Sequence, residues 1–220
     1  MKLATDGAEK LGEALDGDAM ALIEAALADL PADRPGLRLS GRDGLKVLLA
    51  SHGPIGRCSA RFLGSDAQPV RAILFDKSEQ TNWALGWHQD RTIAVREKID
   101  VPGFGPWSVK AGIPHVEPPV ALLQRMVTLR VHLDPVDNAN APLLVASGSH
   151  RFGRVADDDI YGIVDRCATR ACLARRGDIW AYATLILHAS EAARWPRRRR
   201  VVQVDYSAEA LPGGLRFHGV

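Results

Sequence analysis

Residues 177–190 read GDIWAYATLILHAS, a short apolar and aromatic run that ends in a histidine, an alanine and a serine. Other short β-branched or aromatic runs follow residue 64, and Gly, Pro, Asp and Asn separate them: VRAILF (70–75), RTIAVREKI (91–99), MVTLRVHL (126–133), PLLVA (142–146) and RVVQVDY (200–206). Runs of this length with turn signals between them are typical of antiparallel sandwiches and barrels. The sequence therefore predicts a mainly β protein.

The first third of the chain has a helical pattern instead. Apolar residues from Ala8 to Leu30 recur at steps of three and four, which is the spacing of one helix face, and Pro31 and Pro35 follow as stop signals. A second apolar run at 45–49 and a third at 55–63 predict further helical segments. We therefore expect helices packed outside the β core.

Length and composition fit one globular domain. The 220 residues are 46% hydrophobic and 25% charged, and no linker or repeat interrupts them. We expect a single domain over 1–220, with a helical part over about 1–64 and a β core over about 70–206. The formal net charge of +2, from 28 basic and 26 acidic residues, is too balanced for a general attraction to nucleic acid or anionic lipid.

The N-terminal residues include early acidic side chains and no uninterrupted apolar segment, so they do not resemble a signal peptide. No segment approaches the roughly 20 apolar residues needed to cross a bilayer. Cys58, Cys167 and Cys172 form an odd, sparse set without CxxC spacing. We expect free thiols, a cytoplasmic location, and neither a membrane nor a nucleic-acid partner.

Residues 82–91 read NWALGWHQDR and contain a His-x-Asp motif. Side chains at positions i and i+2 of an extended segment point to the same side, so His88 and Asp90 can converge on one metal ion. A lone His-x-Asp is a weak signal, because an aromatic strand end produces it by chance. His188, at the end of an apolar run, is the best third ligand, although such a histidine is as often part of a core. The other histidines are less suitably placed: His52, His115, His132, His150 and His218.

Two imidazoles and one carboxylate on a β scaffold form the facial triad of non-haem Fe(II) sites, which leaves positions open for dioxygen and a co-substrate. The basic run Arg197–Arg200 lies shortly after His188. It allows two interpretations. A solvated basic patch would suit a non-catalytic β-sandwich module that binds a polyanion. An inward-pointing arginine at a strand start would instead require an anion, which a dicarboxylate co-substrate supplies through a bidentate pair.

The combined order of these motifs resembles the phytanoyl-CoA dioxygenase family of Fe(II)/2-oxoglutarate oxygenases. The resemblance spans about residues 73–206 and rests on His88-Gln89-Asp90, the loop 138–143 leading to Gly148-Ser149-His150, and His188-Ala189-Ser190 with Arg199 eleven positions after His188. Two positions depart from the family pattern: Ala141 stands where a glycine is frequent, and Ser147 stands where a proline usually precedes Gly-Ser-His.

The resemblance implies a double-stranded β-helix, or jelly roll, that holds Fe(II) through His88, Asp90 and His188. It also implies that Arg199 and the hydroxyl of Ser190 hold the co-substrate 2-oxoglutarate, and that O2 is the second co-substrate. A small organic molecule of unknown identity would be hydroxylated, with release of succinate and CO2. Related proteins use further groups on neighbouring strands, which correspond here to Lys77, Asn82, Thr128 and Arg130.

Several details remain open at the level of the sequence. Strand alternation favours Arg200 as the inward arginine, because it shares a face with apolar residues, whereas family spacing favours Arg199. The Pro- and Gly-rich segment 101–119 is either a lid or an ordinary crossing loop. Related halogenases have a small residue where this chain has Asp90, so the carboxylate favours C–H hydroxylation. Three tryptophans are candidates to line the site or to fill the core: Trp83, Trp87 and Trp180.

Overall fold

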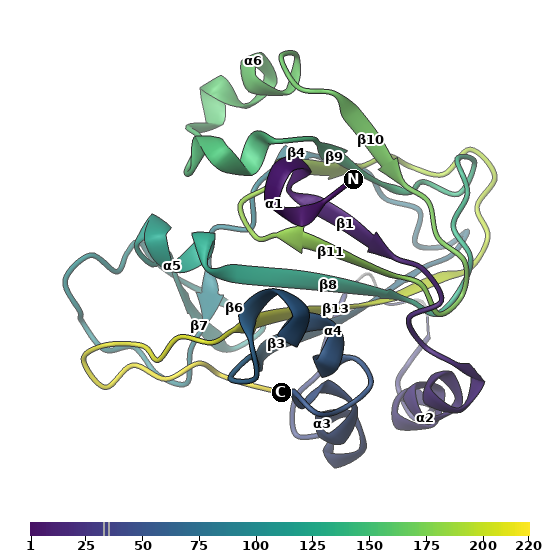
Figure 1. Ribbon diagram of the computed structural model, residues 1–220, viewed down its shortest axis with the longest axis horizontal. Coiled ribbons are helices and arrows are strands. Elements are labelled where there is room, and N and C mark those ends of the chain that lie inside the picture. The colour runs from purple at the N-terminus through teal and green to yellow at the C-terminus, as the bar shows by residue number, and fades with distance from the viewer. Residues whose placement is uncertain (33, 35) are drawn as a thin grey trace.

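The computed structural model describes residues 1–32, 34 and 36–220, and its centre consists of antiparallel β-sheets (Figure 1). The largest sheet has the strand order β1 (Ala8–Leu11), β11 (Ile179–Ala183), β8 (Met126–His132), β13 (Arg199–Ser207), β3 (Gln68–Lys77) and β2 (Leu37–Arg38). A second sheet has the order β10 (Thr169–Cys172), β9 (Leu143–Ala146), β12 (His188–Ser190) and β4 (Leu85–His88). Neighbouring strands are often far apart in sequence, as in a jelly roll, so the predicted fold class is confirmed.

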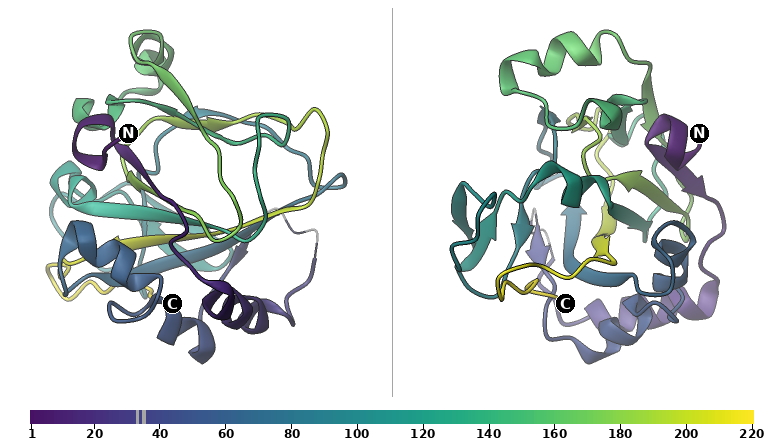
Figure 2. Two further views of the ribbon diagram at one scale, coloured as in Figure 1. Left: turned by 45° about the vertical axis from the view of Figure 1, so that its right-hand side comes forward. Right: turned by 60° about the vertical axis from the view of Figure 1, so that its left-hand side comes forward.

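Helices from the first third of the chain cover the outer face of the large sheet (Figure 2). They are α2 (Gly17–Leu27), α3 (Asp43–Leu49) and α4 (Gly56–Leu63). Their apolar side chains form the main core with alternate residues of β8, β11 and β13. Shorter helical segments lie elsewhere: α1 (Leu3–Asp6), α5 (Val120–Gln124) and α6 (Ile160–Val164), with 3-10 turns η1 (Ser149–Phe152) and η2 (Asp157–Asp159).

The two faces of the large sheet differ: helices cover the outer face, and the inner face lies inside the jelly roll. Side chains of β13 alternate between these two faces. Val202, Val204 and Tyr206 belong to the core beneath the helices. The residues between them point to the opposite, inner face, because side chains alternate along a strand. Gln203 and Asp205 are therefore buried inside the jelly roll, with 5% and 3% of their surface exposed. The inner face is the polar one.

The Pro- and Gly-rich segment 101–119 contains a β-hairpin. Its strands β6 (Trp107–Lys110) and β7 (Ile113–Val116) pair with each other, and β7 also pairs with β5 (Ile93–Ala94), which follows Asp90 in sequence. The segment thus supplies two strands of a three-stranded sheet, whose third strand, β5, follows the His-x-Asp motif.

One sequence prediction fails at the N-terminus. The helix expected from Ala8 to Leu30 is divided into β1, a turn and α2. Ala8 and Leu11 are buried in the pairing with β11, so tertiary contacts override the helical pattern there. Asp16 then caps α2 by accepting a hydrogen bond from the Ala19 backbone N–H at 2.9 Å. Pro35, one of the two expected stop signals, lies outside the described residues.

The helices expected near 45–49 and 55–63 are confirmed as α3 and α4. The three cysteines are free, as predicted. Across the described residues, no helix combines the length and the apolar character that a membrane span requires.

Candidate metal and co-substrate site

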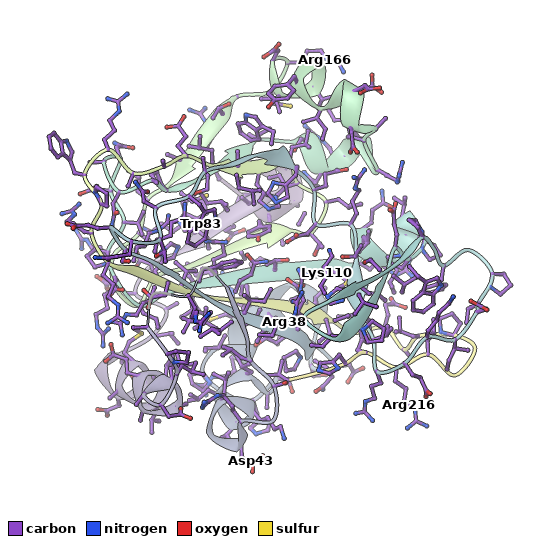
Figure 3. All side chains as sticks on the ribbon, turned by 180° about the vertical axis from the view of Figure 1, so that it is seen from behind. Arg38, Asp43, Trp83, Lys110, Arg166 and Arg216 are labelled. Atoms are coloured by element: carbon purple, nitrogen blue, oxygen red, sulfur yellow. The ribbon has the colours of Figure 1, made fainter. Side chains whose placement is uncertain are left out.

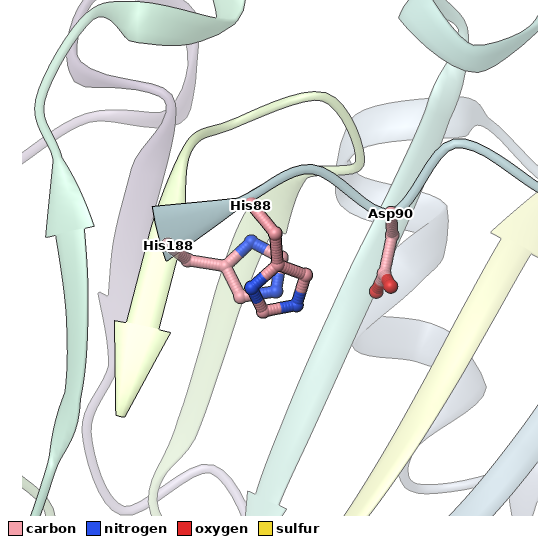
Figure 4. Close-up of side chains that lie close together, drawn as sticks. All are labelled: His88, Asp90 and His188. Carbon is pink, nitrogen blue, oxygen red and sulfur yellow. The ribbon is translucent and has the colours of Figure 1, made fainter. Parts of the chain in front are cut away.

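Two histidine rings meet where β4 and β12 run side by side. His88 is the last residue of β4, His188 is the first of β12, and the two are direct partners in the antiparallel pair. Directly paired residues share one face of a sheet, and the ring centroids lie 4.2 Å apart (Figure 4). Strand pairing thus brings together two imidazoles that are distant in sequence.

Backbone hydrogen bonds fix the tautomer of both rings. His88 Nδ1 donates to the carbonyl oxygen of Gly86 at 2.8 Å, and His188 Nδ1 donates to that of Ile186 at 2.9 Å. Nε2 of each ring is then left with a free lone pair. Burial, followed by the neighbouring His88 ring, lowers the pKa of His188 to about 4. A neutral imidazole with a free Nε2 is the form that binds a metal.

The Asp90 carboxylate completes the group from the turn after β4 (Figure 4). One ligand atom from each of the three side chains lies within 4.8 Å of the other two. Asp90 Oδ2 accepts hydrogen bonds from Gln203 Nε2 at 3.2 Å and from Arg71 Nη2 at 3.5 Å. Burial raises the pKa of Asp90, but the charge of Arg71 and smaller contributions outweigh burial and bring the pKa to about 2. The carboxylate is therefore charged at neutral pH.

The donor set fits a mononuclear iron. Within the described part of the chain, His88, Asp90 and His188 are the one group of three or more His, Cys, Asp or Glu side chains with donor atoms this close. Structural zinc sites usually have a fourth protein ligand. Two imidazoles and one carboxylate instead leave coordination positions open, as in the facial triad of Fe(II) oxygenases.

A cavity of about 130 Å³ adjoins this group and is lined by three cationic side chains, Lys77, Arg130 and Arg199. They come from the neighbouring strands β3, β8 and β13, and Lys77 and Arg199 are direct partners in the strand register. Ser190 of β12 also lines the cavity, and its Oγ accepts a hydrogen bond from Lys77 Nζ at 3.0 Å.

The hydrogen-bond partners of these cations are neutral groups, Arg130 Nε is buried without a partner, and none of the three cations has a carboxylate partner among the described residues. Lys77 donates to two main-chain oxygens. Arg130 Nη1 donates to the Gln203 side-chain oxygen at 2.7 Å, and Arg199 Nη1 donates to the carbonyl oxygen of Ala141. Because a buried charge without a counter-charge is costly, the cavity suits an anion that carries more than one negative charge.

The pKa values of Lys77 and Arg199 also reflect positive charges that lie close together without carboxylate partners. Burial, followed by the charges of Arg199 and Arg130, lowers the pKa of Lys77 to about 7. Burial, followed by the charge of Arg130, lowers the pKa of Arg199 to about 9. A bound dianion would relieve the repulsion among all three groups.

Two of the predicted co-substrate residues lie outside the cavity lining. The Asn82 side chain donates to the backbone oxygen of Ala193 at 3.0 Å and accepts from its N–H at 2.7 Å, so it ties two loops together. Thr128 Oγ1 donates to Asp205 Oδ1 at 3.0 Å within the buried interior. Both residues stabilise the surroundings of the cavity.

The three tryptophans have different surroundings. Trp83 lines the cavity, and Lys77 Nζ lies 4.5 Å from the centre of a Trp83 ring. Trp87 packs against the apolar cluster beneath α6. Trp180 is buried in the inner apolar cluster, and its Nε1 donates to the Leu173 carbonyl oxygen at 3.1 Å. Only the first of the three is a cavity residue.

The arginine run divides between the two faces of β13 and the loop before it. Arg199 is 4% exposed and points into the cavity. Arg200 points the other way and pairs with Asp134 at 2.8 Å and with Glu24 at 3.1 Å. Arg198 pairs with Asp76 at 2.9 Å, and Arg197 pairs with Asp137. Three of the four arginines therefore have acidic partners, and the run is no free basic patch.

Sequence reasoning missed the buried polar network behind Asp90. Arg71 Nε donates to Asp205 Oδ2 at 2.6 Å while Arg71 Nη2 reaches Asp90. Gln203 connects Asp90 to Arg130, because its amide nitrogen donates to Asp90 and its oxygen accepts from Arg130. The signal in the sequence was weak: Gln203 and Asp205 alternate with apolar residues in β13, and Arg71 stands alone among the apolar residues of β3.

Comparison with protein families gives a match to the model for phytanoyl-CoA dioxygenase (PhyH) over residues 43–201, which is most of the chain. The chain belongs to the phytanoyl-CoA dioxygenase family. Membership makes it a non-haem Fe(II)- and 2-oxoglutarate-dependent oxygenase, as the sequence motifs indicated. No curated protein sequence matches the chain.

Solved structures of low sequence identity share the fold. EctD from S. alaskensis, in a structure with 2-oxoglutarate and 5-hydroxyectoine, is 18% identical with a TM-score of 0.63, and the match covers 99% of this chain and 77% of EctD. AviO1 from Streptomyces viridochromogenes Tue57 is 18% identical with a TM-score of 0.64, and 96% and 94% of the two chains are covered. HygX from Streptomyces hygroscopicus, solved with nickel and 2-oxoglutarate, is 12% identical with a TM-score of 0.63, covering 93% and 84%.

Proposed function

We propose that this protein hydroxylates a C–H bond of a small organic molecule, with Fe(II) held by His88, Asp90 and His188. The observation that carries the proposal is the adjoining cavity, in which three cations without carboxylate partners line the same space as the His-Asp-His group. A metal site alone would not need the positive charge of these three side chains. The reaction of 2-oxoglutarate at a metal requires a binding site for a dianion beside the metal site.

Four residues hold 2-oxoglutarate in this proposal. Arg199 pairs with the carboxylate farther from the metal, because its planar fork matches a carboxylate and it is buried at the inner face. Ser190 and Lys77, already hydrogen-bonded to each other, flank that carboxylate. Arg130 adds the third positive charge and, through Gln203, connects the co-substrate cavity to Asp90.

When bound, Fe(II), 2-oxoglutarate and O2 together supply the oxidation: one oxygen atom enters the substrate and the other enters succinate as CO2 is released. The chain supplies position and charge. Asp90 is kept ionised and oriented by Arg71 and Gln203, and both histidines are kept in the metal-binding tautomer by the backbone. The carboxylate of Asp90 also supports hydroxylation, because it occupies the position that halogenases leave open for a halide.

We further infer that residues 1–220 form one oxygenase domain. The N-terminal helices pack on the outer face of the same sheet whose inner face lines the cavity, so the two parts support one site. The three free thiols favour a reducing compartment such as the cytoplasm. The alternative of a polyanion-binding module is not favoured, because Arg197, Arg198 and Arg200 are already paired with acidic residues.

The test is a screen of candidate substrates that measures succinate formation and O2 consumption by iron-loaded protein. We expect Fe(II)-dependent succinate formation that at least one small molecule accelerates, and its loss in His188→Ala. Equal succinate formation by wild type and His188→Ala, both folded and supplied with excess Fe(II), would show that this site does not carry the reaction.

A further inference from the structure

Arg38 faces the interior of the jelly roll, although it lies on the edge strand of the large sheet. It pairs directly with Ile73 of β3, Ile73 pairs with Gln203 of β13, and Gln203 pairs with Arg130 of β8. Residues in such a row share one face of the sheet. Arg38 is therefore on the same face as Gln203, which holds Asp90, and as Arg130, which lines the co-substrate cavity.

Packing around the neighbouring residues agrees with this orientation. A Cβ atom on Gly36 would lie 3.5 Å from Cε1 of Phe75, and Phe75 lines the cavity. Arg38 and Arg71 line one narrow space together with Ala94 of β5 and Ile113 of β7. The three-stranded sheet that follows Asp90 thus packs beside Arg38.

The guanidinium of Arg38 has no counter-charge. It is half-buried, its Nε is buried without a hydrogen-bond partner, and it forms no ion pair with any described residue. Burial lowers the pKa of Arg38, and the charge of Arg71 lowers it further. Arginines in such positions normally pair with a carboxylate or a phosphate, because their planar donors are costly to desolvate alone.

A second cation, Lys110, approaches the same region from the tip of the β6–β7 hairpin. Its Nζ donates to Thr92 Oγ1 at 3.1 Å, two residues after Asp90. Lys110 is exposed at the surface, and partial burial of its side chain together with the charges of Arg71 and Arg38 lowers its pKa, while the charge of Asp90 raises it. Arg38 is near enough for its charge to act on Lys110, and both residues are labelled in Figure 3.

The charges near these two residues do not balance. Arg71 is compensated by Asp205 and Asp90, at 2.6 and 3.5 Å. Asp90 binds the metal in the proposed function, so its negative charge does not compensate Arg38 or Lys110. The co-substrate cations Lys77, Arg130 and Arg199 form a separate group beyond Gln203. Arg38 and Lys110 are left as two positive charges on the Asp90 side of the metal group.

We propose that the substrate carries an oxyanion, as a carboxylate or a phosphate ester, and that Arg38 and Lys110 bind this group. This inference rests on the proposed function, because it takes the His-Asp-His group as the reaction centre. Arg38 supplies a planar fork at the sheet edge, and Lys110 supplies a mobile point charge from the hairpin. The two would orient the substrate so that its reacting carbon faces the metal while 2-oxoglutarate occupies the other cavity.

The test uses the full-length protein loaded with Co(II) and saturated with 2-oxoglutarate, so that the co-substrate cations are occupied. The probe is inorganic phosphate, and the readout is the paramagnetic enhancement of its phosphorus-31 relaxation. We expect a saturable enhancement whose apparent Kd rises at least tenfold in Arg38→Gln and in Lys110→Gln. The matched control is Arg216→Gln, which removes an exposed arginine without an ion pair among the described residues and should leave Kd unchanged (Figure 3).

Competition separates the two sources of the oxyanion. Displacement of the phosphate probe by phenyl phosphate but not by benzoate indicates a phosphate ester. Displacement by benzoate indicates a carboxylate. Neutral benzamide should not displace the phosphate probe. A non-saturable enhancement, or equal Kd values in wild type, Arg38→Gln and Lys110→Gln, would overturn the inference. Binding of 2-oxoglutarate is followed in the same samples by intrinsic fluorescence, and its absence in wild type would refute the proposed function instead.

Discussion

Replacing Arg199 with alanine should weaken 2-oxoglutarate binding without unfolding the protein. Arg199 is 4% exposed, its guanidinium donates to the Ala141 carbonyl oxygen, and the side chain lines the cavity with Lys77 and Arg130. Truncating one member of a buried charge pair costs about 2 to 5 kcal/mol. Lys77 and Arg130 still attract the dianion in the variant, so we expect the lower part of this range, about 2 to 3 kcal/mol.

This loss corresponds to a rise of roughly 30- to 150-fold in Kd, since about 1.4 kcal/mol is a factor of ten. Arg199→Lys should recover only part of the affinity, because an ammonium cannot reproduce the bidentate fork. The assay is an anaerobic titration with 2-oxoglutarate, followed by intrinsic fluorescence because Trp83 lines the cavity.

Arg200→Ala is the matched control. Its guanidinium lies on the helix-covered side of β13 and pairs with Asp134 and Glu24. We expect less than a twofold change in the Kd for 2-oxoglutarate and a modest decrease in the free energy of unfolding, on the order of 1 kcal/mol for partly exposed pairs. A large effect of Arg200→Ala together with none of Arg199→Ala would refute the assignment of Arg199.

Three further outcomes are expected. The pKa of Lys77 is about 7, and a bound dianion raises it. The affinity for 2-oxoglutarate should therefore fall by up to about tenfold per pH unit above pH 7, and Lys77→Met should flatten this pH profile. Asp90→Ala and Asp90→Asn should bind iron more weakly and lose succinate formation even with excess iron; uncoupled turnover at the wild-type rate in both would exclude a ligand role. Tyr206 donates to the buried Leu49 carbonyl oxygen at 2.9 Å, so Tyr206→Phe should lower the free energy of unfolding by about 1 to 3 kcal/mol in chemical denaturation while the Kd for 2-oxoglutarate stays unchanged.

The sequence predicted the parts of the site whose geometry is local. His88 and Asp90 are two positions apart, and His188 ends an apolar run, so strand alternation and motif order were enough to propose them. Motif spacing favoured Arg199 and strand alternation favoured Arg200, and the prediction followed the motif spacing. The alternation argument failed because it assumed that the apolar face of β13 is the inner one, whereas helices cover that face and the cavity is on the polar side.

The sequence could not predict the site residues whose position depends on the pairing register of several strands. Arg71, Gln203 and Asp205 act on Asp90 only because β3 and β13 pair as they do. Arg38 faces the interior because a two-residue strand pairs with β3. No local pattern specifies such pairings. The strand β1 was missed for a related reason, since the periodicity of an amphipathic helix continued through residues that pair with β11 instead.

The measurement that tests the central claim most directly is an anaerobic titration of the Fe(II)-loaded protein with 2-oxoglutarate, followed in the visible spectrum. A weak charge-transfer band should appear and saturate at one equivalent per chain, because the metal group and the cation-lined cavity are adjacent. His188→Ala should abolish the band, and Arg199→Ala should require far more 2-oxoglutarate to reach it. Absence of the band in folded, iron-saturated wild-type protein at any 2-oxoglutarate concentration would contradict the account.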